Sequence, residues 1–286
     1  MRTATFALIG LVAASTAFAQ QQPDFVNARI IARAAQPDVA RAIATVVNTQ
    51  TEPAWITYAV PALNNDAFGR GDGWSERCRL EQQRVDPATK APLPGPIKLE
   101  PAANLMVLVR VQTNEIQRVR TFSGDCQVDA GGLPVYWLGD VNAAQSVAFL
   151  KTLVVNPGSN TAARDHAESA LSAIALHRDA AASGAIVDLA KNGTPRLRQR
   201  ALAWIARRAE SQAVGIISQA IDNDPDVEVK KQAVSALGQL PKNEGVPLLI
   251  KLARSHTNPV VRKQAMQRLG QSNDPRALSF FEEVLK

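Results

Sequence analysis

The segments Thr194-Pro-Arg-Leu-Arg-Gln-Arg-Ala201, Asp226-Val-Glu-Val-Lys-Lys-Gln-Ala233 and Asn258-Pro-Val-Val-Arg-Lys-Gln-Ala265 repeat one pattern. Their final alanines are 32 residues apart each time. Each segment opens with a residue that favours a helix N-cap and continues with apolar residues at helical spacing. A fixed period of this length, built of amphipathic helices, predicts a stack of helical hairpins.

A partnering helix repeats in step with these segments. Its apolar columns recur every 31 or 32 residues, at Ile186, Ile217, Leu249 and Phe281, and again at Leu189, Ala220, Leu252 and Val284. The helices that begin at 194, 226 and 258 carry a matching apolar face, which includes the column Leu202, Val234 and Met266. Each hairpin is therefore expected to bury one face on its neighbour and to be unstable alone.

In these residues the chain resembles HEAT-type repeats, including the HEAT-like repeats of bilin lyases. The matching features are the helix-starting cap, a closing Leu-Gly at 237–238 and 269–270, and an apolar residue followed by a basic one: Leu197-Arg198, Val229-Lys230 and Val261-Arg262. A degenerate earlier copy runs from Arg164 to Leu176. The resemblance covers roughly residues 142–286. It implies an all-α solenoid of antiparallel helix pairs and a scaffold or protein-interaction role, because the family only rarely supplies enzymes.

The N-terminal part has a different sequence pattern, in which alternating apolar and polar residues and turn residues replace helical periodicity. The pattern predicts strands over residues 29–33, 54–60, 105–111 and 116–122, and a helix over residues 37–47. Thr113-Asn114 is expected to form the turn between the third and fourth of these strands. Arg118 and Arg120 predict that one face of the fourth strand is exposed to solvent. An α+β domain over residues 20–140 is therefore expected before a repeat domain over residues 141–286.

The first 19 residues have the composition of a secretory signal peptide. Met-Arg-Thr-Ala is followed by an apolar run from Phe6 to Ala14 and by Ala17-Phe18-Ala19, a small-x-small cleavage site. The apolar run is shorter than the roughly 20 residues needed to span a bilayer. We therefore expect cleavage after Ala19, a periplasmic or secreted location, and no membrane span.

The positive charge of the chain is unevenly distributed. The formal net charge is +6, yet residues 20–140 carry 12 Lys/Arg against 13 Asp/Glu, and residues 141–286 carry 19 against 13. Export argues against DNA or RNA as the ligand of this basic half. A protein partner with an acidic surface is the expected target. Nothing in the sequence indicates an oligomeric state.

Cys78 and Cys126 are the only cysteines of the chain. In an exported protein an even pair predicts one disulfide. Closing a loop of 48 residues stabilises the fold by roughly 4 kcal/mol in the chain-entropy model. The alternative, a redox or metal pair, lacks support because there is no Cys-x-x-Cys motif and no histidine before His166.

Two sets of basic residues in the repeats lead to different predictions. Arg198, Lys230 and Arg262 fall inside the apolar arc of their helices, so they are predicted to form a structural ladder, each head pairing with an acid or carbonyl of the adjacent repeat. The opposite face of these helices is the predicted partner-binding surface, and a solvated helix surface is the alternative. Its basic residues are Arg196, Arg200, Arg207, Lys231 and Lys263.

The segment from Phe122 to Leu138 is a second candidate site. It places Asp125 and Asp129 beside the expected disulfide and a Gly131-Gly132 turn, followed by Tyr136 and Trp137. These residues predict a ligand- or substrate-binding module related to the cell wall as the alternative function. The competing interpretation is that the aspartates cap tight turns and the aromatic residues pack where the two domains meet.

Catalytic constellations are not evident in the sequence. The three histidines, His166, His177 and His256, lie in the repeat half, with no His-Glu-x-x-His and no Gly-x-Ser-x-Gly motif. We therefore predict no catalytic residues, no metal and no cofactor. The expected function is that of a non-enzymatic interaction or scaffold protein of the bacterial envelope.

Overall fold

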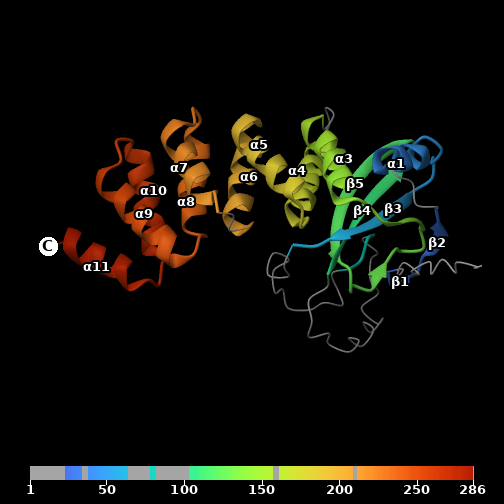
Figure 1. Ribbon diagram of the computed structural model, residues 1–286, viewed down its shortest axis with the longest axis horizontal. Helices are drawn as coiled ribbons and strands as arrows, with labels where there is room; N and C mark the ends of the chain where they lie inside the picture. The colour runs from blue at the N-terminus through green and yellow to red at the C-terminus, as the bar shows by residue number, and fades with distance from the viewer. Residues whose placement is uncertain are drawn as a thin grey trace, which may run out of the picture.

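The computed structural model describes residues 23–33, 38–63, 78–81, 103–156, 161–208 and 211–285. The expected signal peptide, residues 1–19, lies outside them. Figure 1 shows a β-sheet at one end of the molecule, from which helices run in a row to the C-terminus. The predicted fold class, an α+β part followed by a helical solenoid, is confirmed.

Among the described residues, seven strands form the sheet region. They are β1 (Phe25–Val26), β2 (Arg29–Ala32), β3 (Ala54–Pro61), β4 (Asn104–Gln112), β5 (Glu115–Ser123), β6 (Val128–Asp129) and β7 (Pro134–Asp140). Five of them make one mixed sheet in the order β2-β7-β3-β4-β5, and β1 pairs with β6 in parallel. The strands predicted from the sequence match β2, β3, β4 and β5, whereas β7 was not predicted.

Strand β7 lies inside the sheet, between β2 and β3, although it is the last strand along the described residues. It runs parallel to both β2 and β3. Between the pairs Trp137–Thr57 and Asp140–Ala59, β7 has one residue more than β3. Gly139 lies in this bulge with φ of 82°, a backbone angle that favours glycine.

The β4–β5 hairpin turns at Thr113 and Asn114, as predicted, and both residues have positive φ. The Asn114 side chain donates to the carbonyl oxygens of Val47 and Asn48 at 3.1 and 2.8 Å. The hairpin is thereby fixed to the end of helix α1 (Val39–Val47). Strand β5 forms one edge of the sheet.

The helices after the sheet pair as antiparallel hairpins. Their bounds are α3 (Ala143–Val155), α4 (Thr161–Leu176), α5 (Ala180–Asn192), α6 (Pro195–Arg208), α7 (Ala213–Asn223), α8 (Val227–Leu237), α9 (Lys242–Ser255), α10 (Pro259–Gly270) and α11 (Pro275–Val284). The side chain of Asp226 caps α8 by accepting from the N–H groups of Glu228 and Val229. Asn258 caps α10 in the same way, by accepting from Val260.

Packing between repeats is closest along the second helices of the hairpins, where α6 contacts α8 and α8 contacts α10. The apolar column of these helices is buried at Leu202 and Val234, but Met266 is exposed, and Val284 of the partnering column is exposed as well. Both belong to the end of the stack, where no further hairpin follows among the described residues to cover them.

The sheet and the repeats share one continuous hydrophobic core, which includes Val107 and Val119 of the sheet as well as Leu171 and Ile174 of α4. A backbone bridge also joins Ala62, just beyond β3, to His177, just beyond α4. The backbone N–H of Leu63 donates to the carbonyl of Leu176 at 2.7 Å. The first helical hairpin is therefore seated directly on the sheet.

A chain of buried polar groups lies at this junction. His177 is fully buried, and its Nδ1 lies 2.7 Å from the carbonyl oxygen of Ala173. A carbonyl only accepts, so Nδ1 carries the proton and Nε2 accepts from the Ser146 hydroxyl, 2.8 Å away. The Tyr58 hydroxyl lies 2.9 Å from Ser146 Oγ. Burial lowers the pKa of His177 to about 4, against raising contributions from Ala173 and Asp179.

Candidate functional site

An open cleft lies where the sheet edge meets the repeats. It has a volume of about 440 Å³. Its walls come from strand β5 and from helices α4 and α6, which belong to three different parts of the chain. The lining residues are Val119, Arg120, Thr121, Phe122, Glu168, Ser169, Ser172, Arg200, Ala203, Trp204 and Arg207. We call this the β5–α6 cleft.

Strand and helix geometry explain which of these side chains share a face. Successive strand residues point to opposite faces, so Arg120 and Phe122 share one side of β5. In α6, at about 100° per residue, Arg196 and Arg207 fall within about 40° of Arg200. The helical period therefore places three arginines of α6 on one face, and two of them, Arg200 and Arg207, line the cleft.

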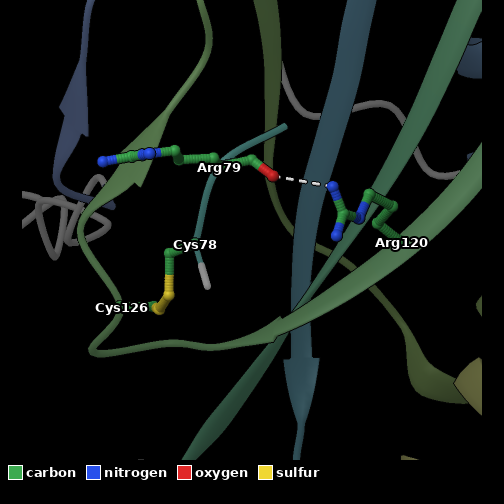
Figure 2. The surroundings of a disulfide bond; sticks show 4 residues. All are labelled: Cys78, Arg79, Arg120 and Cys126. Atoms are coloured by element: carbon green, nitrogen blue, oxygen red, sulfur yellow. Dashed lines mark hydrogen bonds between the residues drawn. A yellow bond between two sulfur atoms is a disulfide. The ribbon is translucent and has the colours of Figure 1, made fainter. Parts of the chain in front are cut away.

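Arg120 is held in place by several contacts. Its Nη1 donates to the carbonyl oxygen of Arg79 at 2.6 Å (Figure 2) and to that of Leu80 at 3.3 Å. Its guanidinium lies over the ring of Phe122, 5.3 Å from the centroid. Burial lowers the pKa of Arg120, neighbouring Arg118 lowers it further, and Glu81 raises it. The positive charge of Arg120 is therefore only partly compensated.

The α6 wall of the cleft contains both paired and stacked cations. Arg200 Nη2 lies 3.1 Å from a carboxylate oxygen of Glu168 in α4, and Arg196 pairs with the other oxygen of the same carboxylate. Arg207 lies over the ring of Trp204 at 5.2 Å. Glu168 is the one acidic residue among the lining side chains, against three arginines. The cleft consequently favours anions.

Lys231 and Lys263 of the predicted partner-binding set lie farther along the stack. Lys231 pairs with Glu228 of its own helix at 2.9 Å, and Lys263 is exposed on α10. With the repeat step of 32 residues, both fall in the column of Gln199, about 100° from the column of Arg200. The structure thus gathers the arginines of α6 at the sheet end and leaves the two lysines separate from the cleft.

The column Arg198, Lys230 and Arg262 contacts carbonyl groups at the ends of the preceding helices. Arg198 donates to Gly193 at 2.8 Å, Lys230 to Ile221 and Asp222 at 2.8 and 2.6 Å, and Arg262 to His256 and Thr257 at 2.7 and 3.0 Å. These carbonyls belong to the same hairpin, since each lies at the end of its first helix. They do not belong to the adjacent repeat.

Arg198 alone of this column also reaches the following hairpin, through a bidentate pair with Asp224. The two nitrogen–oxygen distances are 2.8 and 2.9 Å. The hydrogen bonds that Arg198 donates to Asp224 raise the pKa of Arg198. Burial alone raises the pKa of Asp224, but the hydrogen bonds from Arg198 and from the Asp226 backbone bring it below its usual value.

The predicted disulfide is present between Cys78 and Cys126, whose Cα atoms are 6.3 Å apart. It attaches residues 78–81 to the face of the sheet that carries Trp55 and Leu108. Glu81 strengthens this attachment by accepting from Trp55 Nε1 at 3.0 Å and from Arg110 Nε at 2.8 Å. The segment that positions Arg120 is therefore itself cross-linked to the sheet (Figure 2).

The second candidate site, Asp125 to Trp137, is not assembled by the structure. Asp129 accepts from Asn27 and from the N–H of Gly131, and so stabilises a turn. Tyr136 donates to Gln50 at 2.9 Å, on the α1 side of the sheet. Trp137 is buried in strand β7, and it points to the face of the sheet opposite to that of Tyr136, because successive strand residues point to opposite faces. Asp125 has one buried carboxylate oxygen without a hydrogen-bond partner among the described residues.

Several residues of the β5–α6 cleft escaped the sequence analysis. Arg120 was predicted only to lie on a solvent-exposed strand face, and Phe122 only to begin the other candidate segment. Trp204 and Glu168 were not predicted as site residues. A signal existed, because two arginines interrupt the apolar pattern of β5. It did not reveal that β5 and α6 line one cleft, since the two elements are about 80 residues apart in the chain.

Neither a metal centre nor a membrane-spanning helix is found within the described residues. No group of three or more His, Cys, Asp or Glu side chains there is arranged to hold a metal ion. In that same part of the chain, no helix has both the length and the apolar character needed to cross a membrane. His256 lies 3.4 Å from Asp222 at the end of α9.

Comparison with known proteins identifies the repeats. The family of HEAT repeats matches residues 183–253 and, in an overlapping match, residues 214–286. The resemblance predicted from the sequence is thereby confirmed for residues 183–286, which are HEAT repeats of an α-solenoid. Such repeats indicate a protein-interaction or scaffold role. No curated protein matches the chain.

Two solved structures are similar to about half of the chain. Human deoxyhypusine hydroxylase in complex with glycerol is 17% identical, with a TM-score of 0.37, and the match covers 49% of this chain and 46% of that one. An engineered protein is 24% identical, with a TM-score of 0.27, and the match covers 50% of this chain and 72% of that one. This chain thus spans less than half the length of the hydroxylase.

The first of these similarities corrects one prediction. A hydroxylase is an enzyme, so the structures to which the chain is similar include an enzyme. The prediction of a non-enzymatic protein was wrong in treating helical repeats and the absence of familiar catalytic motifs as sufficient grounds. Helical repeats provide a scaffold on which side chains of any chemistry can be placed.

Proposed function

We propose that this HEAT-repeat protein is an exported interaction protein of the bacterial envelope, which holds an acidic partner protein on the face formed by its second helices. The observation that carries the proposal is the set of arginines at the sheet end of that face. Arg196, Arg200 and Arg207 project from one side of α6. Among the cleft-lining residues, the acidic side chain that offsets this positive charge is Glu168.

The shape of the repeat stack supports this choice. From α6 onward the second helices pack more closely than the first helices, which places their outer surface on the inside of the solenoid curve, where such proteins usually bind extended surfaces. The surface continues past the cleft with polar side chains, and Gln264 Nε2 of α10 donates to Ser235 Oγ of α8 at 3.0 Å. A partner can therefore follow the repeats from the sheet towards the C-terminus.

Export rests on two observations from different parts of the chain. The first 19 residues have the charged start, apolar run and small-x-small site of a signal peptide. The disulfide between Cys78 and Cys126 also suits an oxidising compartment such as the periplasm. Mass spectrometry of the protein recovered from a periplasmic fraction should give Gln20 as the first residue. Recovery only from the cytoplasm with Met1 intact would contradict export.

A pull-down tests the interaction itself. The mature protein on a resin should retain a partner from an envelope extract, and this retention should weaken as salt is raised. The double variant Arg200→Glu with Lys231→Glu should release most of the partner, because charge reversal opposes an acidic surface. The control is Arg254→Glu, which changes an exposed charge on α9 that pairs with Glu283. Equal retention by all three proteins would exclude the second-helix face.

A further inference from the structure

We infer that the β5–α6 cleft is a composite receptor for an acidic peptide segment of the partner, in which carboxylates flank one aromatic or large aliphatic side chain. This inference rests on the proposed interaction function and adds the chemistry and the place of the contact. It makes the sheet a part of the binding site, together with the repeats.

Two stacked guanidinium groups line the cleft. Arg120 lies over Phe122 on the β5 wall, and Arg207 lies over Trp204 on the α6 wall, at 5.3 and 5.2 Å from the ring centroids. Stacking on a ring holds the guanidinium plane while leaving its N–H edge available for a carboxylate. A guanidinium ordered in this way loses little further freedom on binding. The cleft therefore presents two preorganised sites that can bind a carboxylate, one on each wall.

The existing hydrogen bonds leave capacity for a ligand. Of the three nitrogen atoms of the Arg120 guanidinium, Nη1 contacts the carbonyls of Arg79 and Leu80. Arg207 makes its stacking contact with Trp204, and no ion pair or hydrogen bond to it is present among the described residues. Burial and Arg118 lower the pKa of Arg120. An incoming carboxylate would offset both effects, because it stabilises the charged form.

Glu168 shows how the α6 arginines already receive a carboxylate. Its two oxygens contact Arg196 and Arg200, while its side chain is only 22% exposed. The pair occupies the α4 side of the cleft, so the charge left for a ligand is that of Arg120 and Arg207. Removing the Glu168 charge should therefore strengthen the binding of an acidic ligand.

The apolar part of the cleft favours a ligand that carries an apolar group. Phe122, Ala203 and Trp204 of the lining are all only partly buried. Partly exposed aromatic side chains in a concave site are typical anchors for a partner side chain. A wholly charged ligand would leave this surface uncovered, whereas one aromatic or aliphatic side chain would bury it.

Peptide binding to the mature full-length protein tests the inference. The probe is a fluorescein-labelled peptide, Glu-Glu-Phe-Glu-Glu, with blocked ends, and the two comparison peptides replace every Glu by Gln or the Phe by Ala. Fluorescence anisotropy should give the tightest binding for the first peptide. We expect each comparison peptide to bind about tenfold more weakly, the usual scale for losing a charge contact or an apolar anchor.

Variants on each wall separate the composite cleft from a site on the repeats alone. Arg207→Gln and Arg120→Gln should each weaken the parent peptide about tenfold, and Glu168→Gln should strengthen it several-fold. Arg254→Gln is the matched control, because Arg254 also lies over an aromatic ring, that of Phe280, but on α9. It should change binding less than twofold. Thermal melting establishes that each variant is folded, and Phe122→Ala replaces Arg120→Gln if the latter is not.

Several outcomes would overturn the inference. These are equal binding of all three peptides, no binding of the parent peptide at millimolar concentration, binding unaffected by changes on the β5 wall, or tighter binding of heparin than of the peptide. If the partner in the pull-down is still released by Arg200→Glu with Lys231→Glu, the interaction function survives and the composite cleft is wrong. If that release also fails, the proposed function itself is wrong.

Discussion

Apart from the β4–β5 hairpin, neighbouring strands of the five-stranded sheet come from distant parts of the chain, whereas in the repeats each helix packs on helices close to it in sequence. Arg29 lies beside Pro134, and Ala54 lies beside Val111. By contrast, Arg198 reaches Gly193 in its own hairpin and Asp224 in the next. The sheet therefore depends on a few long-range constraints, and the repeats depend on many equivalent short-range ones.

This contrast implies that damage should spread differently in the two regions. A lost constraint in the sheet releases strands that no local contact holds, so the loss should be large and shared by the whole sheet. A lost contact in the repeats should be smaller and limited to adjacent hairpins. Four substitutions or changes of condition test this difference.

The largest effect is expected from removing the disulfide. Replacing Cys78 and Cys126 by serine should lower the free energy of unfolding by about 4 kcal/mol, because the loop between them no longer restricts the unfolded chain. Urea unfolding measures the loss. Hydrogen exchange should accelerate in β3 and β4 and remain unchanged in α8 and α10. Faster exchange chiefly in α8 and α10 would show that the two regions are not distinct.

Acid should act at the junction of the two regions, through His177. Its pKa is about 4 in the folded protein and about 6.5 when unfolded. Between these values the unfolded state binds the proton and the folded state does not, so stability decreases as pH falls from about 6.5 to about 4. The difference between the two pKa values of His177 corresponds to about 3 kcal/mol in the free energy of unfolding.

Urea unfolding at pH 7 and pH 4 of the wild type and of His177→Gln measures this contribution. The variant should lose about 3 kcal/mol less than the wild type over that interval, since glutamine does not titrate. An identical pH dependence in both proteins would mean that His177 is not buried and neutral in the folded state.

Within the repeats, Arg198 should contribute more to stability than Arg262, because of these two residues only Arg198 joins two hairpins. Arg198→Met leaves Asp224 buried without its partner, and we expect a loss of about 2 kcal/mol. Arg262→Met removes contacts to two carbonyls of its own hairpin and should cost less. Urea unfolding compares the two variants. An equal loss would mean that the contact between hairpins adds nothing.

The smallest effect is expected at a helix cap. Asp226→Ala removes the side chain that accepts from Glu228 and Val229, which typically costs about 1 kcal/mol. Hydrogen exchange should accelerate in the first turn of α8 alone. Glu282→Ala on the exposed surface of α11 is the control and should leave the melting temperature unchanged. A global acceleration in the Asp226 variant would show that the repeats are as cooperative as the sheet.

The same contrast explains which predictions from the sequence succeeded. Thr113-Asn114 and the caps Asp226 and Asn258 were recognised because their hydrogen bonds are local and their residue preferences are strong. Strand β7 was not predicted, because its residues Pro134–Asp140 follow a glycine turn and include two aromatic residues that were assigned to the candidate ligand-binding segment. Its place inside the sheet depends on partners about 80 and 100 residues away.

The sequence by itself determined the stack of helical hairpins, their caps, the internal position of the Arg198 column and the pairing of Cys78 with Cys126. Helical hydrogen bonds join residues four apart, so a period and a face can be recognised along the chain. Only the tertiary structure decided that β5 and α6 would line one cleft. The β5–α6 cleft therefore depends on the shared core that seats α4 on the sheet, and no local pattern brings Arg120 and Arg207 to opposite walls of one site.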